Sequence, residues 1–232
     1  FTCSNLGTNN VVLNVNDGNG NTASCNAVVT VVDLIPPTML CKPLSVYLNA
    51  AGTATATAAQ INNGSTDNCT LVSLALAPGT FTCANLGPNT VTLMGTDQSG
   101  NTATCQSVVT VIDTIKPTML CKDATLNLNI AGQATLTVAA INNGSFDNCT
   151  IVSLTLSQTL FTCGNLGSNN PVKLVGTDQS GNSSFCTATV TVLDLIAPAA
   201  KCKNITANLG AAGTVGVLPS SVDNVSTDNC SF

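Results

Sequence analysis

The sequence repeats the tripeptide Asp-Asn-Cys, whose residue types could bind a metal ion or take part in catalysis. Its three copies end at Cys69, Cys149 and Cys230. Two further Asp positions recur with nearly the same spacing, so carboxylates and thiols reappear at regular intervals. Ca²⁺ takes six to eight oxygen ligands, which Asp, Asn and main-chain carbonyls supply. A repeated calcium site is therefore one hypothesis for this pattern.

The best calcium candidates are the Asp residues that end each β-rich run, just before a proline-containing stretch. They are Asp33, Asp113 and Asp194; the other recurrent sets are Asp17, Asp97 and Asp178, and Asp67, Asp147 and Asp228. The alternative is turn chemistry, because Asp and Asn side chains bind nearby backbone N–H groups. Both interpretations stay open, and Ca²⁺ is the only cofactor that the sequence suggests.

Missing residue types argue against catalysis. The chain has no His, Arg, Glu or Trp. It therefore lacks the side chain that titrates near neutrality and the bidentate clamp for carboxylate or phosphate. We expect no catalytic residues and no enzyme.

The charge of the chain restricts its partners. Charged residues make up 7% of the sequence, and the formal net charge is −5. Nucleic acid is excluded, because no basic stripe exists to replace counterions on phosphate. Apolar runs are broken well before the 18 or more residues of a membrane helix, so we expect no membrane span in this segment.

Twelve Cys residues predict disulfides rather than metal sites. Cys-rich zinc sites use close pairs separated by two to four residues. Here the tightest spacing, from Cys69 to Cys83, is 14 positions. An even number of Cys without such pairs indicates an oxidising, extracellular setting.

Internal repetition defines the domains. Phe-Thr-Cys, Gly-Asn-(Thr/Ser) and Asp-Asn-Cys motifs recur about every 80 residues, and each repeat boundary carries Pro. We predict all-β, tandem Ig-like antiparallel sandwiches, because short β-branched segments alternate with turn residues. The predicted strands of one repeat are 45–50, 53–61, 71–77, 89–95 and 107–113. The predicted units are 1–33 (C-terminal half of a repeat), 34–113 and 114–194 (complete repeats) and 195–232 (N-terminal half).

Four Cys per repeat allow three pairings. The first strand of an Ig-like sandwich commonly runs beside the last, which favours Cys41–Cys105 and leaves Cys69–Cys83. Repetition gives Cys121–Cys186 and Cys149–Cys163. The half repeats at both ends suggest a window of a longer array, so we expect Cys3, Cys25, Cys202 and Cys230 to have partners outside it.

The motif order resembles HYR-type Ig-like repeats, most closely those of large secreted Bacteroidetes surface proteins such as SprB-like gliding adhesins. The resemblance rests on residues 91–113, their copy at 172–194 and the three Asp-Asn-Cys motifs. It implies an extracellular, cell-surface stalk or filament that acts as a disulfide-clamped spacer. The expected partners are neighbouring repeats or other copies of the chain. The alternative is a module that itself binds surface polysaccharide, with Ca²⁺ as a possible requirement.

Overall fold

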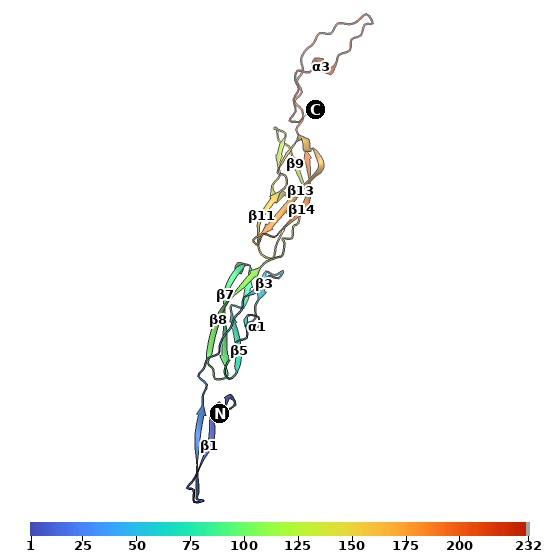
Figure 1. The fold of residues 1–232 in the computed structure, drawn as a ribbon. Coiled ribbons are helices and arrows are strands. Elements are labelled where there is room, and N and C mark those ends of the chain that lie inside the picture. The colour runs from blue at the N-terminus through green and yellow to red at the C-terminus, as the bar shows by residue number, and fades with distance from the viewer. Residues whose placement is uncertain (231–232) are drawn as a thin grey trace. The chain divides into compact units, whose positions relative to one another are not determined.

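The computed structural model describes residues 1–230, which divide into two compact units. The first unit runs from Phe1 to Ile115, and the second begins at Lys116. The regular secondary structure of both is almost entirely β-strand (Figure 1). The protein is an all-β chain of tandem, disulfide-stabilised Ig-like repeats, and each unit contains one complete repeat.

The complete repeat of the first unit pairs a four-stranded sheet with a two-stranded sheet. The larger sheet has the order β3-β8-β7-β5, in which β3 is parallel to β8 and the other neighbours are antiparallel. The smaller sheet pairs β4 with β6. The bounds are β3 Leu44–Tyr47, β4 Thr53–Thr55, β5 Leu71–Ala77, β6 Thr80–Thr82, β7 Gly87–Asp97 and β8 Thr102–Ile112.

Alternation along the strands builds the core between these sheets. In the Thr-Ala-Thr-Ala stretch, Ala54 and Ala56 are buried while the intervening Thr side chains face solvent, as expected for a pleated strand. Phe81 lies opposite Ala54 in the register and is 1% exposed. The two small Ala side chains leave the space that this large ring fills.

One predicted strand is partly wrong. The strand expected over 53–61 ends at Thr55, and a single helical turn, α1 Ala58–Ile61, follows it. The Gln60 side chain closes the start of this turn, because its oxygen accepts the Thr57 N–H at 2.9 Å. The turn places Ile61 in the core with no exposed surface. Local capping therefore overrides the strand propensity of this stretch.

Residues 1–33 of the first unit form a two-stranded hairpin after a short 3₁₀ turn. The turn is η1 Cys3–Asn5, and the strands are β1 Gly7–Asn16 and β2 Thr22–Val31. Leu13 on this hairpin is 58% exposed, whereas its counterpart in the complete repeat, Leu93, is fully buried. The difference arises because a second sheet covers Leu93 in the complete repeat.

The second unit repeats this architecture. Its larger sheet has the order β11-β13-β14-β9 and its smaller sheet pairs β10 with β12. Among residues 195–230 the structure has a one-turn helix and isolated bridges but no strand. The elements are β9 Ala124–Asn127, β10 Gln133–Thr135, α2 Val138–Ile141, β11 Ile151–Leu156, β12 Leu160–Thr162, β13 Gly167–Asp178, β14 Ser183–Leu193 and α3 Pro219–Val222. The 3₁₀ turns η2 Cys83–Asn85 and η3 Cys163–Asn165 precede β7 and β13.

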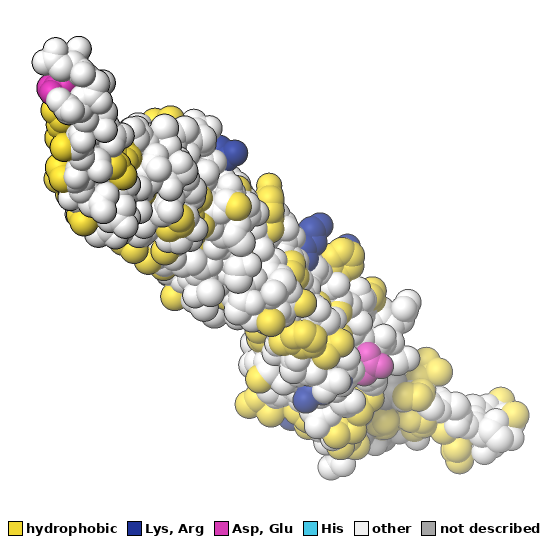
Figure 2. Space-filling model, turned by 90° about the horizontal axis from the view of Figure 1, so that it is seen from below, with side chains coloured by type: hydrophobic (Ala, Val, Ile, Leu, Met, Phe, Trp, Pro, Cys, Tyr) yellow, Lys and Arg dark blue, Asp and Glu magenta, His cyan; other side chains and the backbone are white. Residues whose placement is uncertain are grey.

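The surface carries little charge. On the face drawn in Figure 2, Lys and Asp side chains are sparse among uncharged polar groups and scattered apolar ones. Across residues 1–230, none of the helices has the length and apolar character needed to cross a membrane.

Candidate functional site

One disulfide closes the complete repeat on itself. Cys41 and Cys105 are bonded, with their Cα atoms 6.0 Å apart, and this is the pair expected from the sequence. The parallel pairing of β3 with β8 explains it. Cys41 stands three residues before Leu44, whose partner is Val109, so Cys41 lies beside the early part of β8.

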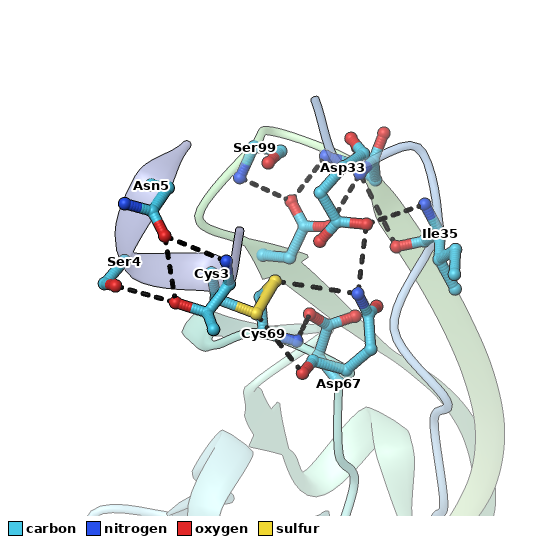
Figure 3. Close-up of a disulfide and its surroundings, with 12 residues drawn as sticks. Cys3, Ser4, Asn5, Asp33, Ile35, Asp67, Cys69 and Ser99 are labelled. Atoms are coloured by element: carbon cyan, nitrogen blue, oxygen red, sulfur yellow. Dashed lines mark hydrogen bonds between the residues drawn. A yellow bond between two sulfur atoms is a disulfide. The ribbon is translucent and has the colours of Figure 1, made fainter. Parts of the chain in front are cut away.

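A second disulfide crosses from the preceding segment into the repeat. Cys3 of the hairpin segment bonds Cys69 of the first Asp-Asn-Cys motif, with a Cα–Cα distance of 5.3 Å. Figure 3 shows this bridge beside Asp33 and Asp67. The expected pair Cys69–Cys83 is therefore wrong, and so is the expectation that Cys3 finds its partner outside the chain.

The sheet topology explains why Cys69 and Cys83 cannot meet. Cys69 precedes β5, which begins opposite Asp97, the last residue of β7. Cys83 precedes β7, whose first residue Gly87 pairs with Val111 near the end of β8. The two Cys residues therefore lie at opposite ends of the sheet. The length of β5 alone, about 20 Å at 3.3 Å per residue, exceeds the roughly 7 Å limit for disulfide Cα atoms.

The second unit contains the same two kinds of bridge. Cys121 bonds Cys186 within the repeat, as expected, and Cys163 of Phe-Thr-Cys bonds Cys230 of the last Asp-Asn-Cys. The expected pair Cys149–Cys163 and the expected outside partner for Cys230 are therefore wrong.

The remaining four Cys residues complete the inventory. Cys83 and Cys149 are disulfide-bonded as well. All twelve Cys residues fall within 1–230, and of these Cys25 and Cys202 are free, exposed thiols. That their partners lie outside this chain stays a prediction.

Three Asp residues meet next to the Cys3–Cys69 bridge. One carboxylate oxygen each from Asp33, Asp67 and Asp97 lies within 4.8 Å of the other two. The three come from different places in the sequence: the segment after β2, the Asp-Asn-Cys motif, and the end of β7. Each belongs to a different recurrent Asp set, so the fold brings together positions that the sequence could only identify separately.

Asp97 is held by the turn that follows it. Its Oδ1 accepts the N–H groups of Ser99 at 2.9 Å and Asn101 at 2.8 Å, and its Oδ2 accepts the Asn101 side-chain amide at 2.7 Å. Burial acts to raise the pKa of Asp97, but the hydrogen bonds from Asn101, Ser99 and Gly100 together hold that pKa below its ordinary value. The carboxylate therefore stays ionised in its buried position.

Asp33 joins the preceding segment to two loops of the repeat. Its Oδ1 accepts the Ile35 N–H at 3.1 Å and the Asn68 side-chain amide at 3.2 Å. Its main-chain carbonyl accepts the Asn101 side-chain amide at 3.0 Å. Asn68 and Asn101 thus fix the point at which the chain enters the repeat.

Two carboxylate oxygens of the cluster lack a hydrogen-bond partner. These are Oδ2 of Asp33 and Oδ1 of Asp67, and both are buried. The other oxygen of Asp67 accepts the Cys69 N–H at 2.9 Å, so the Asx turn predicted for this motif is present. In Asp33 and Asp67, turn hydrogen bonds therefore account for one carboxylate oxygen and leave the other without a partner.

Most of this arrangement recurs at the C-terminal end of the second unit. Asp194 Oδ1 accepts the Ile196 N–H at 3.1 Å and the Asn229 side-chain amide at 3.0 Å. Asp228 Oδ2 accepts the Cys230 N–H at 3.4 Å, while its Oδ1 is again buried without a partner. Of the three expected calcium positions, Asp33 and Asp194 therefore lie in equivalent surroundings. Asp113 is buried and accepts the Ile115 N–H at 3.1 Å.

Gly132 shows how closely the chain packs at this second bridge. Its φ of +67° is one that L side chains rarely adopt. A Cβ atom there would lie 2.7 Å from both the Asn229 carbonyl oxygen and the Cys163 sulfur. Only glycine satisfies both the backbone conformation and the close approach.

Replacing Asn101 with Ala is expected to destabilise the first repeat by about 1–3 kcal/mol, because it removes donors to a buried carboxylate and to the Asp33 carbonyl. The pKa of Asp97 is depressed in the folded state. The part of the stability loss that comes from removing the Asn101 donors to the charged Asp97 carboxylate is therefore present at neutral pH. It should disappear as the pH falls through that folded-state pKa. Urea unfolding at pH 7 and pH 3 measures both effects.

Asn21→Ala is the matched control for that experiment. Asn21 makes the same bond to Asp17, at 2.6 Å, but in the exposed hairpin turn. We expect this control to change stability by less than about 0.5 kcal/mol. Equal losses from the two substitutions would show that the bonds to Asp33 and Asp97 contribute nothing beyond the turn itself.

Residues 32–111 match the HYR domain family. The match covers the first complete repeat, which is similar to an HYR-type Ig-like domain. The chain is also 30% identical over 215 residues to Hyalin from Strongylocentrotus purpuratus, a match that covers 86% of this chain and 18% of Hyalin. The chain thus spans about a fifth of that relative.

Two solved structures show more distant similarity. Human Protocadherin-24 EC1-2 has a TM-score of 0.39 at 11% identity, covering 69% of this chain and 99% of that one. Titin domains I67–I69 have a TM-score of 0.36 at 9% identity, covering 83% and 76%. The disulfides of this chain fit an extracellular setting.

Proposed function

We propose that this chain is a disulfide-clamped spacer segment of a cell-surface adhesion protein. The observation that carries the proposal is the interlocking of two bridges in the first unit. Cys3–Cys69 ties the preceding segment to the repeat, and Cys41–Cys105 ties the first strand of the repeat to its last. Because residue 41 lies inside the loop closed by the first bridge, tension along the chain meets covalent bonds before it can unravel the sheet.

Composition supports a spacer over a binding module. Aromatic residues make up 3% of the chain, and the Phe residue that recurs is the one in Phe-Thr-Cys. In the complete repeats this residue, Phe81 or Phe161, is buried and therefore unavailable as a binding platform. Aromatic side chains are the usual anchors of recognition surfaces. The partners that we propose are the neighbouring repeats and other copies of the chain.

The motif resemblance supports a finer proposal, that the parent protein is a bacterial surface filament or adhesin stalk. The support for this finer proposal is the recurrence of the Asp-Gln-Ser-Gly-Asn turn and of the Asp-Asn-Cys motif.

Pulling the oxidised chain by its two ends tests the spacer function. A spacer is expected to hold its length under constant load and to lengthen stepwise once reductant opens the bridges. Extension to the same length with and without reductant would contradict it. Saturable binding of the oxidised chain to surface polysaccharide would instead favour the alternative, a repeat that itself binds a surface.

A further inference from the structure

We propose that Asp33, Asp67 and Asp97 bind one Ca²⁺ ion at the point where residues 1–33 join the following repeat. This goes beyond the spacer function. The contributing oxygens lie within 4.8 Å of one another. Ca²⁺–oxygen distances of 2.3–2.6 Å allow two ligands of one ion to lie up to about 5 Å apart. Their spacing is therefore compatible with one shared ion.

The unsatisfied oxygens are the independent sign of a ligand. Asp33 is 8% exposed, its Oδ2 has no partner, and Asp67 Oδ1 is likewise buried and unpaired. A buried, unpaired carboxylate oxygen is costly, and such groups in native structures call for an ion or water. In Figure 3 Asp33 and Ser99 of the β7–β8 turn lie above Asp67, and the disulfide is close to Asp67.

Among residues 1–115 the side chains offer a single cation to balance these charges. Lys42 is the single Lys between residues 1 and 115, which also contain no Arg or His, and its side chain is exposed. Three carboxylates packed this closely repel one another in a medium of reduced dielectric. A divalent ion from solution removes that repulsion.

The ligand types favour calcium over other ions. The ligands are all oxygens, and the nearby sulfurs of Cys3 and Cys69 are joined in a disulfide, so they cannot act as thiolate ligands. Soft-metal and imidazole sites are thereby excluded. Mg²⁺ requires distances of 2.0–2.1 Å and keeps most of its water, whereas Ca²⁺ accepts several carboxylates. A solvent-facing hollow lined by Asp33, Ser99 and Asn101 gives access for the ion.

The proposed ion joins two structural parts. Asp33 belongs to the segment that leaves β2, while Asp67 and Asp97 belong to loops of the repeat that follows. Bound Ca²⁺ would therefore act beside the Cys3–Cys69 bridge as a second, reversible fastening. Its expected dissociation constant is that of an extracellular module, about 0.1–1 mM.

Hydrogen exchange of the full oxidised chain tests this inference without any substitution. In 10 mM CaCl₂ compared with EDTA, we expect slower exchange in peptides that cover residues 33–36, 67–70 and 97–101. No change in these peptides would overturn the proposal. Equal protection by 10 mM MgCl₂ would overturn the assignment to Ca²⁺.

Substitutions then assign the ligands. The double change Asp33→Asn and Asp67→Asn should abolish this protection and remove one ion from the Ca²⁺ stoichiometry measured by equilibrium dialysis. Asp17→Asn is the control, because Asp17 is the hairpin counterpart of Asp97 and lies outside the cluster; it should change neither readout. Unaltered stoichiometry and protection in the double variant, with its disulfides formed, would overturn the proposal.

Discussion

Reduction of the first unit is expected to lengthen it under load by about 250 Å. With both bridges closed, the shortest covalent path from Cys3 to Cys105 crosses to Cys69, runs back to Cys41 and crosses again. That path contains about 28 residues (69 minus 41), or roughly 95 Å at 3.4 Å per residue. The open backbone contains about 102 residues (105 minus 3), or roughly 350 Å. Optical tweezers with handles at residues 1 and 115 of the full chain measure the difference.

Single-bridge variants sharpen this prediction. Without Cys3–Cys69 the shortest path is about 38 residues, and without Cys41–Cys105 it is about 36, so each variant should reach only about 120–130 Å. Either bridge alone therefore limits extension, and only the loss of both releases the full length. The variants are the paired substitutions Cys3→Ser with Cys69→Ser, and Cys41→Ser with Cys105→Ser. A full-length release in either variant would contradict the interlocked path.

The thermodynamic role of the bridges is separate from this mechanical one. In the chain-entropy model, the 64-residue separation of Cys41 and Cys105 corresponds to a stabilisation of about 4 kcal/mol. That is comparable to the whole net stability of a small domain. The Cys41–Cys105 bond therefore contributes both to short extension under load and to resistance to heat. The variant with Cys41→Ser and Cys105→Ser separates the two effects, because it loses the stabilisation while Cys3–Cys69 alone still limits extension.

The sequence was sufficient for those parts of the fold that depend on local periodicity and repetition. Short β-branched segments separated by turn residues predicted an all-β repeat, and the structure agrees. The pairing of Cys41 with Cys105 followed from the parallel neighbourhood of first and last strands. Both inferences need only the repeat itself.

The Cys3–Cys69 bridge could not be derived in the same way, because it depends on which end of the sheet each Cys motif occupies. Treating the repeat as closed led to Cys69–Cys83, a short loop in sequence. The signal that corrects it was present: β7 runs from the Phe-Thr-Cys motif to the turn at Asp97, so the motif must lie at the far end of the sheet from that turn. Cys69, which precedes β5 beside the turn, can then bond only a neighbouring segment.

The acidic cluster shows the same limit. The sequence identified Asp33 as a candidate ligand and Asp67 and Asp97 as recurrent positions. Nothing in the spacing indicated that one oxygen from each would come within 4.8 Å of the others. Turn chemistry and ion binding are alternatives in the sequence, but in Asp33 and Asp67 they would use different oxygens of the same carboxylate. Asp67 demonstrates this, with one oxygen bound to the Cys69 N–H and the other unpaired.

Phe81→Ala is expected to destabilise the first complete repeat by about 3–5 kcal/mol. The ring is 1% exposed and lies opposite Ala54 in the register, a small side chain that cannot expand to fill the cavity. The effect is measured by hydrogen exchange of the β7 and β8 amides, with β13 and β14 of the other repeat as the internal reference.

The same motif supplies the control, because Phe1 occupies the equivalent position in the hairpin segment and is 69% exposed. Phe1→Ala should change the exchange of β7 and β8 by less than the equivalent of about 0.5 kcal/mol. If Phe81→Ala were equally mild, the ring would not be the centre of the core, and the disulfides would have to supply nearly all of the stability of the repeat. If the disulfides supply nearly all of the stability, reduction alone should unfold the repeat. If the core is built on Phe81, the reduced chain should keep residual protection from hydrogen exchange in β7 and β8.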